Sequence, residues 1–261
     1  MRYVIVDVFS DRPLAGNGLC VVLDPCPDPL MQAVALEMKL SETTFPVVTG
    51  DGSYEVRIFT PTTELPFAGH PSIGTAWALG PNRWEQTSAG AVVTVEADAD
   101  GATMTQPDPE LTEVDATGVA EALGVAGVEA AWHSVAGGTR HVLVPTDAPI
   151  ERIAPNLGDV ADVAARAGGI SLCPFRRLDD ETLHVRLFAP GAGVAEDPGT
   201  GSAAGPIAVL ARQLWGVADD VRIRQGDEIG RPCRISARGV PGDVRVGGRV
   251  TRCAEGRLLL P

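Results

Sequence analysis

The amino-acid sequence predicts an α+β protein made of two related halves, each a curved β-sheet wrapped around a central helix. Residues 56–76, VRIFTPTTELPFAGHPSIGTA, return in weaker form as VRLFAPGAGVAEDPGTGSAAG at 185–205. Each copy is typical of a strand, a Gly- and Pro-rich loop and a helix. The two helices, His70–Leu79 and Ser202–Leu214, lack a polar face, which indicates that each is buried inside its half.

The repeat keeps its register over a long distance. The strands Val56–Phe59 and Val185–Phe188 are offset by 129 positions (185 − 56), and Gly69 and Gly201 by 132 (201 − 69), close to half of the 261 residues. The flanks repeat the order Gly-rich turn, apolar strand, helix-like stretch, strand. They comprise 14–24, 28–39 and Thr43–Val48 in the first half, and 135–147, 156–168 and Ser171–Arg176 in the second. A common strand–helix rhythm is the alternative, but three matches in register favour an internal duplication.

Further strands complete the two sheets. The opening MRYVIVDVF alternates apolar and other residues, as a strand does. Four more short strands are predicted at Val92–Glu96, Val142–Pro145, Val221–Arg224 and Val244–Val246. We place the boundary in the loop Pro107–Asp115, which gives an N-terminal half of residues 1–114 and a C-terminal half of residues 115–261. The last strand is a candidate to return to the N-terminal half.

Composition excludes several classes of function. The net charge is −13 and the charges are scattered, so nucleic acid is not an expected partner. No apolar run approaches the roughly 20 residues that span a membrane, and the start lacks the plan of a signal peptide, so we expect a cytoplasmic protein. Five cysteines without a C-x-x-C pair indicate neither a disulfide scaffold nor a metal site. The single lysine, Lys39, disfavours Schiff-base chemistry.

The starts of the two buried helices are where chemistry is expected. A helix N-terminus presents free N–H groups and a partial positive charge, so it binds carboxylates and stabilises oxyanions. We expect Gly69-His70 and Gly201-Ser202 to face each other across a cleft between the halves and to bind a small anionic substrate. Glycine at these places lets a substrate approach the backbone.

Titratable side chains near these starts are the candidates for acid–base work. Glu42 directly precedes the predicted strand Thr43–Val48, His70 lies at the first helix start and Asp197 beside the second. Each has a plain structural alternative: a solvated turn residue, a packed or capping histidine, and an acid favoured by the helix dipole. Glu64 and Glu196 are candidates to partner nearby N–H groups. The remaining candidates are His141 and Asp7.

Six segments carry a resemblance to a known family. They are DVFSDRPLAGN (7–17), LSETTF (40–45), RIFTPTTELPFAGHPSIGTA (57–76), GGTRHVLV (137–144), EDPGTGSAAGP (196–206) and QGDEIGRP (225–232). In this order, over essentially the whole chain, they resemble the PhzF family of phenazine biosynthesis. The resemblance implies a diaminopimelate epimerase-like fold and a homodimer. It also implies an isomerase that uses no cofactor and converts trans-2,3-dihydro-3-hydroxyanthranilate, a small anionic cyclic amino acid, to an aminoketone.

The same resemblance assigns roles to individual residues. The Glu of the L-S-E motif, the family's base, matches Glu42. The substrate-binding residues of the family match His70, Asp197 and Ser202, with the accompanying glycines Gly69 and Gly201. One carboxylate suits this reaction, because a ring proton moves from the carbinol carbon to the carbon bearing the carboxylate on one face. Departures from the family pattern, Pro198-Gly199 and Gly18, change no assigned side chain.

Three other functions are alternatives. An amino-acid racemase or epimerase of the same fold uses two opposed thiols, but neither helix motif contains a cysteine. Glu42 aligns with the region of Ile170 and Ser171, so the base is not duplicated, and the thiol racemase is rejected. An isomerase of another cyclic amino acid, from a different secondary-metabolite pathway, stays open. A binding protein that keeps the fold is disfavoured, because a binder does not need the base.

Overall fold

The polypeptide divides into two compact units. The computed structural model describes residues 1–259. Unit 1 comprises residues 1–105 and 247–261, and unit 2 comprises residues 106–246. The chain returns to unit 1 within the long strand β16 (Asp243–Arg257). The predicted loop Pro107–Asp115 contains a strand, β9 (Glu110–Val114), which belongs to unit 2.

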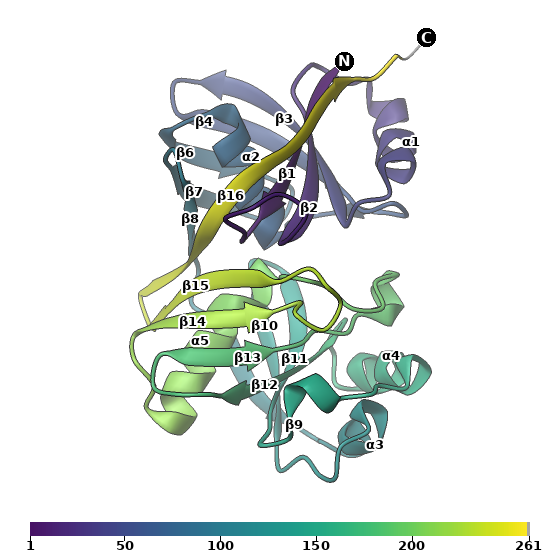
Figure 1. The fold of residues 1–261 in the computed structure, drawn as a ribbon, viewed down its shortest axis with the longest axis vertical. Coiled ribbons are helices and arrows are strands. Elements are labelled where there is room, and N and C mark those ends of the chain that lie inside the picture. Colours follow the sequence, from purple (N-terminus) through teal and green to yellow (C-terminus); the bar gives the residue numbers. More distant parts are fainter. Residues whose placement is uncertain (260–261) are drawn as a thin grey trace. The chain divides into compact units, whose positions relative to one another are not determined.

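Unit 1 is built on a closed barrel. Its strands are β1 (Arg2–Val8), β2 (Asn17–Val22), β3 (Glu42–Gly50), β4 (Ser53–Phe59), β6 (Asn82–Thr87), β7 (Val92–Ala97), β8 (Gly101–Gln106) and β16. Neighbours pair in this order, and β16 also pairs with β1, so these eight strands of the described chain form a ring. The short β5 (Glu64–Leu65) adds to β4. Figure 1 shows β16 running beside β1.

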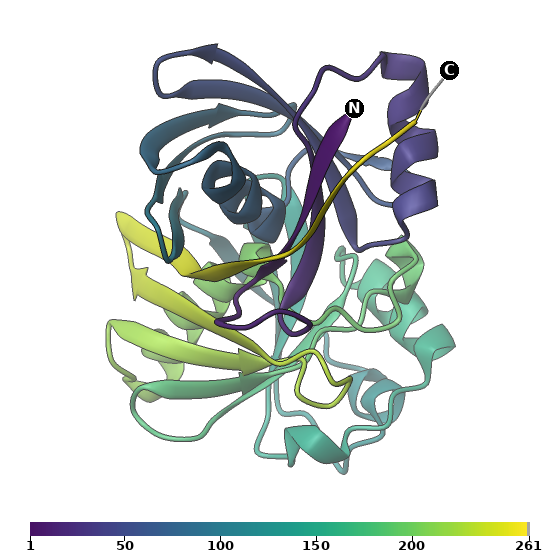
Figure 2. The same cartoon turned by 45° about the horizontal axis from the view of Figure 1, so that its top comes forward.

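The central helix of unit 1 is α2 (Gly69–Leu79). It packs against β1, β2, β3 and β7, and its residues 69–76 are all buried. Close packing requires Gly74, because a Cβ there would lie 2.6 Å from Leu19 Cδ2 and 2.8 Å from Val8 Cγ2. The second helix, α1 (Asp28–Met38), packs on β3 and β4 outside the strands (Figure 2). The predicted buried helix is therefore confirmed.

Unit 2 repeats the pairing pattern of unit 1. Its strands are β9, β10 (Ala131–Ala136), β11 (Thr139–Pro145), β12 (Leu172–Arg177), β13 (Thr182–Val185), β14 (Asp220–Gln225), β15 (Cys233–Val240) and the start of β16. From β10 to β15 the pairs alternate antiparallel and parallel, as they do from β1 to β7. The two halves therefore have one topology, as expected from a duplicated sequence.

The central helix of unit 2 is α5 (Gly201–Trp215). It packs against β10, β11 and β15, and its residues 201–211 are all buried. The smaller elements are α3 (Val119–Leu123), α4 (Leu157–Arg166), η1 (Ile150–Arg152) and η2 (Pro190–Ala192). Helices α3 and α4 enclose a separate apolar cluster with β11. Within residues 1–259, no helix is long and apolar enough to cross a lipid bilayer.

One predicted strand is displaced. Val185–Phe188 was expected to be a strand, but β13 ends at Val185, and Phe188 forms only an isolated bridge with Leu172. The reason lies in Pro174: the Arg186 N–H still donates to the Pro174 carbonyl at 3.0 Å, but proline has no N–H with which to return the ladder bond. The buried Arg186 guanidinium bonds the carbonyls of Ile150 and Ile153. The other predicted strands overlap observed ones.

Candidate active site

In unit 1 the structure brings Glu42 and His70 together. Glu42 is the first residue of β3 and His70 the second residue of α2. Glu42 Oε2 lies 3.1 Å from His70 Nε2, and the two side chains are only 13% and 5% exposed. The parallel pairing of β2 with β3 starts at Glu42, opposite Leu19. A strand start and a helix start therefore place a carboxylate beside an imidazole.

The neighbours of His70 define its protonation. Burial lowers the pKa of His70 to about 3, so the ring is neutral near pH 7. Asn17 Nδ2 lies 3.3 Å from His70 Nδ1, and an amide nitrogen can only donate, so Nδ1 accepts. The ring proton is then on Nε2, which faces Glu42. The Glu42 carboxylate thus faces a neutral N–H group rather than an imidazolium.

The first turn of α2 is held from its side by buried polar groups. The Ser72 hydroxyl donates to the carbonyl of Ala68 at 2.9 Å and accepts from Gln86 Nε2 at 2.8 Å. The Tyr54 hydroxyl donates to Gln86 Oε1 at 2.7 Å. The N-cap residue Ala68 offers no side-chain acceptor, so no N-cap side chain occupies the N–H groups of this turn.

In unit 2 the start of α5 is arranged around Asp197. The Thr200 hydroxyl donates to Asp197 Oδ2, and the Asp197 N–H donates to the carbonyl of Leu187 at 3.0 Å. Thr200 is the N-cap residue, yet its hydroxyl makes no cap bond. In α4, by contrast, the Asn156 side chain accepts from the N–H groups of the first turn. Helices α2 and α5 thus begin without the side-chain cap that α4 has.

Ser202 takes part in a buried chain of hydrogen bonds. It is the second residue of α5, and its hydroxyl lies 2.9 Å from His141 Nε2. His141 Nδ1 lies 2.7 Å from the Ser171 hydroxyl. Burial lowers the pKa of His141 to about 4, so the ring is neutral and bridges the two serines with one donor and one acceptor. Sequence reasoning named His141 as a candidate, but did not connect it with Ser202.

The two units differ at the position of Glu42. In unit 1 the second residue of the helix, His70, contacts a carboxylate at the strand start, Glu42. In unit 2 the second residue of the helix, Ser202, reaches Ser171 beside the start of β12, and it does so through His141. The aligned position therefore holds a hydroxyl in place of a carboxylate.

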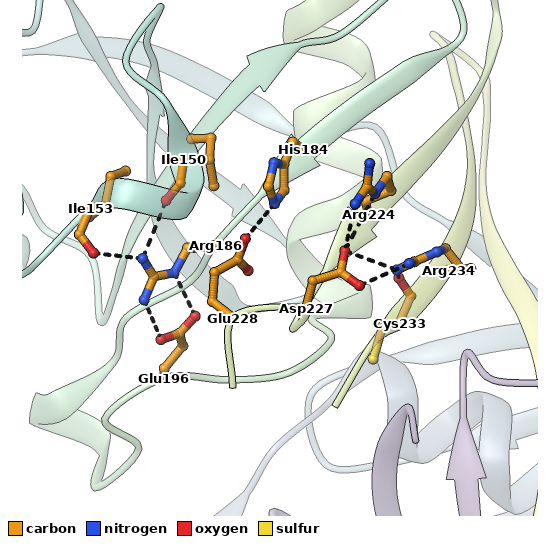
Figure 3. Close-up of polar contacts among 10 residues, drawn as sticks. All are labelled: Ile150, Ile153, His184, Arg186, Glu196, Arg224, Asp227, Glu228, Cys233 and Arg234. Carbon is orange, nitrogen blue, oxygen red and sulfur yellow. Dashed lines mark hydrogen bonds and ion pairs between the residues drawn. The ribbon is translucent and has the colours of Figure 1, made fainter. Parts of the chain in front are cut away.

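The remaining sequence candidates have structural partners. Asp7 is buried, and its carboxylate accepts from the Leu14 N–H at 2.7 Å. Glu64 makes two hydrogen bonds to Arg57, and Glu196 makes two to Arg186 (Figure 3). Both acids therefore bind arginine side chains. Gly69 and Gly201 are the buried first residues of their helices.

All five cysteines are free, and none lies at the start of α2 or α5. Burial raises the pKa of Cys20 to about 12 and raises that of Cys173 as well, so both are protonated thiols. In the part of the chain that the structure describes, no three His, Cys, Asp or Glu side chains gather as a metal site would require.

Acid is expected to destabilise the protein through its buried histidines. The pKa of His141 falls from 6.5 to about 4 on folding, so the unfolded chain binds the proton more readily. The stabilisation is complete above about pH 6.5 and is lost as the pH falls toward about 4. Between about pH 6.5 and 5, the wild type should lose about 1–2 kcal/mol more unfolding free energy than His141→Gln does. Urea denaturation at the two pH values measures this difference.

The control for this prediction is His133→Gln, which removes a half-buried histidine of β10 whose ring contacts the Gly168 carbonyl. This variant should change the pH dependence less than His141→Gln does, because the side chain that it removes is only half-buried. An equal change in both variants would contradict the assignment of acid sensitivity to His141.

The sequence is similar to those of known isomerases over nearly its whole length. Residues 6–256 match the family model described as phenazine biosynthesis-like protein. A trans-2,3-dihydro-3-hydroxyanthranilate isomerase of Pseudomonas aeruginosa is 37% identical and is covered over 99% of both chains. An uncharacterized isomerase of Mesorhizobium japonicum is 34% identical, again over 99% of both.

The fold is similar to those of solved structures. A PhzF-family phenazine biosynthesis protein of Bacillus anthracis aligns over 100% of this chain and 99% of its own, with a TM-score of 0.86 and 21% identity. A hydroxyproline epimerase of Agrobacterium vitis aligns over 98% and 91%, with a TM-score of 0.69 and 12% identity. Both matches show the fold alone. Fold and relatives together define an isomerase with the diaminopimelate epimerase-like fold.

Within this class of isomerases, the sequence comparison also identifies the family. The chain belongs to the phenazine biosynthesis-like family, PhzC-PhzF. The resemblance drawn from the six sequence segments is thereby confirmed.

Proposed function

We propose that this enzyme converts trans-2,3-dihydro-3-hydroxyanthranilate to an aminoketone in phenazine biosynthesis, with Glu42 as its only base. The observation that carries the proposal is the Glu42–His70 contact, a mostly buried carboxylate beside a neutral imidazole with no carboxylate at the aligned position of unit 2. The 37% identity to the isomerase of Pseudomonas aeruginosa over 99% of both chains supports the choice of substrate.

The reaction requires one proton to move within the ring. The Glu42 carboxylate takes the proton from the carbinol carbon, and the electron pair left behind shifts through the conjugated system. The carboxyl group then returns the proton to the carbon bearing the carboxylate, and the resulting enol tautomerises to the ketone. The net change is an isomerisation, so no oxidant or reductant is consumed. The buried site favours this return, because water competes less for the proton.

The other assigned residues bind the substrate in this proposal. His70 and Asp197 bind the amino and oxygen groups as charge develops, and the Ser202 hydroxyl binds the carboxylate with help from helix N–H groups. His141 supports this role of Ser202: when His141 Nε2–H donates to Ser202 Oγ, the serine proton is available to the substrate. Ser171 then donates to Nδ1.

The proposal is tested by incubating the purified wild type with this substrate in buffer that contains a chelator and no added cofactor. Loss of substrate and formation of product are followed by mass spectrometry. We expect turnover under these conditions. A folded protein that does not turn over this substrate contradicts the substrate assignment.

An isomerase of another cyclic amino acid is the second candidate. It is favoured by the 34% identity to an uncharacterized isomerase of Mesorhizobium japonicum and by the departures Pro198-Gly199 and Gly18. Turnover of a different cyclic amino acid, with the phenazine precursor inert, would establish it. The homodimer stays a prediction, and a sizing measurement that finds only monomer would contradict it.

A further inference from the structure

The segment QGDEIGRP (225–232) carries part of the family resemblance but has no place in the mechanism above. Its turn is anchored within unit 2: the Arg231 N–H donates to the Gly226 carbonyl at 2.9 Å, and Glu228 Oε1 lies 2.9 Å from His184 Nε2. Asp227 forms ion pairs with Arg224 and Arg234 (Figure 3). The segment is thus held firmly on the sheet, so its first residue has a fixed position.

That first residue, Gln225, is bonded entirely to the loop that carries Asp197. The side chain is 1% exposed. Its Nε2 donates to the Asp197 carbonyl at 2.9 Å and to Thr200 Oγ1 at 3.0 Å, and its Oε1 accepts from the Thr200 N–H at 3.2 Å. The two N–H groups of the amide and its oxygen are therefore all hydrogen-bonded to Asp197 or Thr200.

These bonds give the Thr200 hydroxyl a direction. A hydroxyl has one proton to donate. Because Thr200 Oγ1 accepts from Gln225 Nε2, its own proton is available for Asp197 Oδ2, to which it donates. The chain of bonds runs from Gln225 through Thr200 to the Asp197 carboxylate.

The next residue allows this close approach. Gly226 has a φ of +78°, and a Cβ there would lie 2.5 Å from the Pro198 carbonyl oxygen and 2.4 Å from that of Arg231. Only glycine fits between these two carbonyls. The pair Gln225-Gly226 and the loop 197–200 therefore form one packed, hydrogen-bonded unit.

We propose that Gln225 is a positioning residue for the isomerisation, which orients the Asp197 carboxylate through Thr200 and fixes the first turn of α5. This inference rests on the proposed function for its kinetic test, since it assigns Asp197 to substrate binding. It adds a residue that touches neither the substrate nor the base.

The test replaces Gln225 by its isostere, in Gln225→Glu. An ionised carboxylate has no proton to donate, so it faces the Asp197 carbonyl and Thr200 Oγ1 with oxygen and draws the threonine proton away from Asp197. When protonated, the same group accepts from the Thr200 N–H and donates one bond, which restores most of the network. Burial raises the pKa of a carboxyl group, so the protonated form is accessible in mildly acidic buffer.

The groups around position 225 do not obscure this titration. Asp197 lies on the bonded loop, and Cys233 lies opposite Gln225 in the β14–β15 ladder. Burial raises the pKa of the Cys233 thiol well above its usual value, so it stays protonated. The charges that act on Cys233 are those of Asp197, Asp227, Arg231 and Arg234.

We expect kcat/KM of Gln225→Glu to be about 100-fold below wild type near about pH 8, a loss typical of a displaced active-site group. At about pH 5.5, kcat/KM of the variant should lie within about 10-fold of the wild-type value at the same pH. Thr200→Ser should retain activity and Thr200→Val should not. The control Gln32→Glu, in which a glutamine also donates to a backbone carbonyl, should show no pH-dependent deficit.

A deficit that is the same at every pH, or equal activities of Thr200→Ser and Thr200→Val, would overturn the inference. If the wild type is inactive on the substrate, the proposed function fails and hydrogen exchange of residues 200–204 decides instead. Gln225→Glu should then lower their protection at the higher pH and regain it at the lower one, after correction for intrinsic rates. Unchanged protection of these amides at both pH values would contradict the positioning role, and this test requires no substrate.

Discussion

Glu42→Gln is expected to lower kcat by about 10³-fold or more, which is the range that general acid–base catalysis contributes. The amide keeps the shape of the side chain and can still lie beside His70 Nε2, which is 3.1 Å from the carboxylate. It cannot take up a proton from carbon. Kinetics with the phenazine precursor would measure the loss, and calorimetry would show that ligand binding persists.

The matched control is Glu64→Gln. Glu64 lies in the same half of the chain, is more exposed than Glu42, and is paired with Arg57 by two hydrogen bonds of 2.7 and 2.8 Å. Its activity should stay close to wild type. Retained turnover in Glu42→Gln would contradict the role of Glu42 as the base.

The largest effect on stability is expected from Glu196→Ala. Glu196 and Arg186 have side chains only 11% and 9% exposed, and they form two hydrogen bonds of 2.8 and 2.7 Å. Figure 3 shows the same guanidinium bonded to the carbonyls of Ile150 and Ile153. Removing the carboxylate takes from a buried cation its hydrogen-bonded ion-pair partner, which costs about 3–5 kcal/mol of unfolding free energy.

Urea denaturation measures this loss, and the exposed pair Arg222–Glu181 provides the comparison. That pair has a similar separation of 2.8 Å, but its side chains are 73% and 61% exposed. Glu181→Ala should therefore cost less than about 1 kcal/mol. If the two variants lose the same free energy, burial does not determine the strength of the Arg186–Glu196 pair.

Much of the fold could be predicted from the sequence, because the duplication and the uniformly apolar helices leave local signals. The predicted helices begin one residue after α2 and α5 do. Ring closure through β16 had no local signal: only Val244–Val246 was predicted, whereas the strand extends to Arg257 and pairs with β1. Pairing between chain ends depends on tertiary structure, which periodicity does not report.

The candidate site residues could be named from the sequence, but the contacts between them could not be predicted. The contact of Glu42 with His70 and the exposure of both side chains follow from how a strand and a helix pack. His141, Thr200 and Gln225 act through side-chain hydrogen bonds between residues up to 61 positions apart, as between His141 and Ser202. The acids Glu64 and Glu196 resembled helix-start partners, because the nearby arginines that bind them are not adjacent in sequence.

In the proposed mechanism, Glu42 takes one proton from the substrate and returns the same proton. Its most direct test is turnover of unlabelled substrate in deuterated water, with the product examined early by NMR and mass spectrometry. We predict that much of the product keeps protium at the carbon bearing the carboxylate, because the Glu42 side chain is only 13% exposed. Complete deuteration of that carbon from the first turnover would contradict direct transfer by a single shielded carboxyl group.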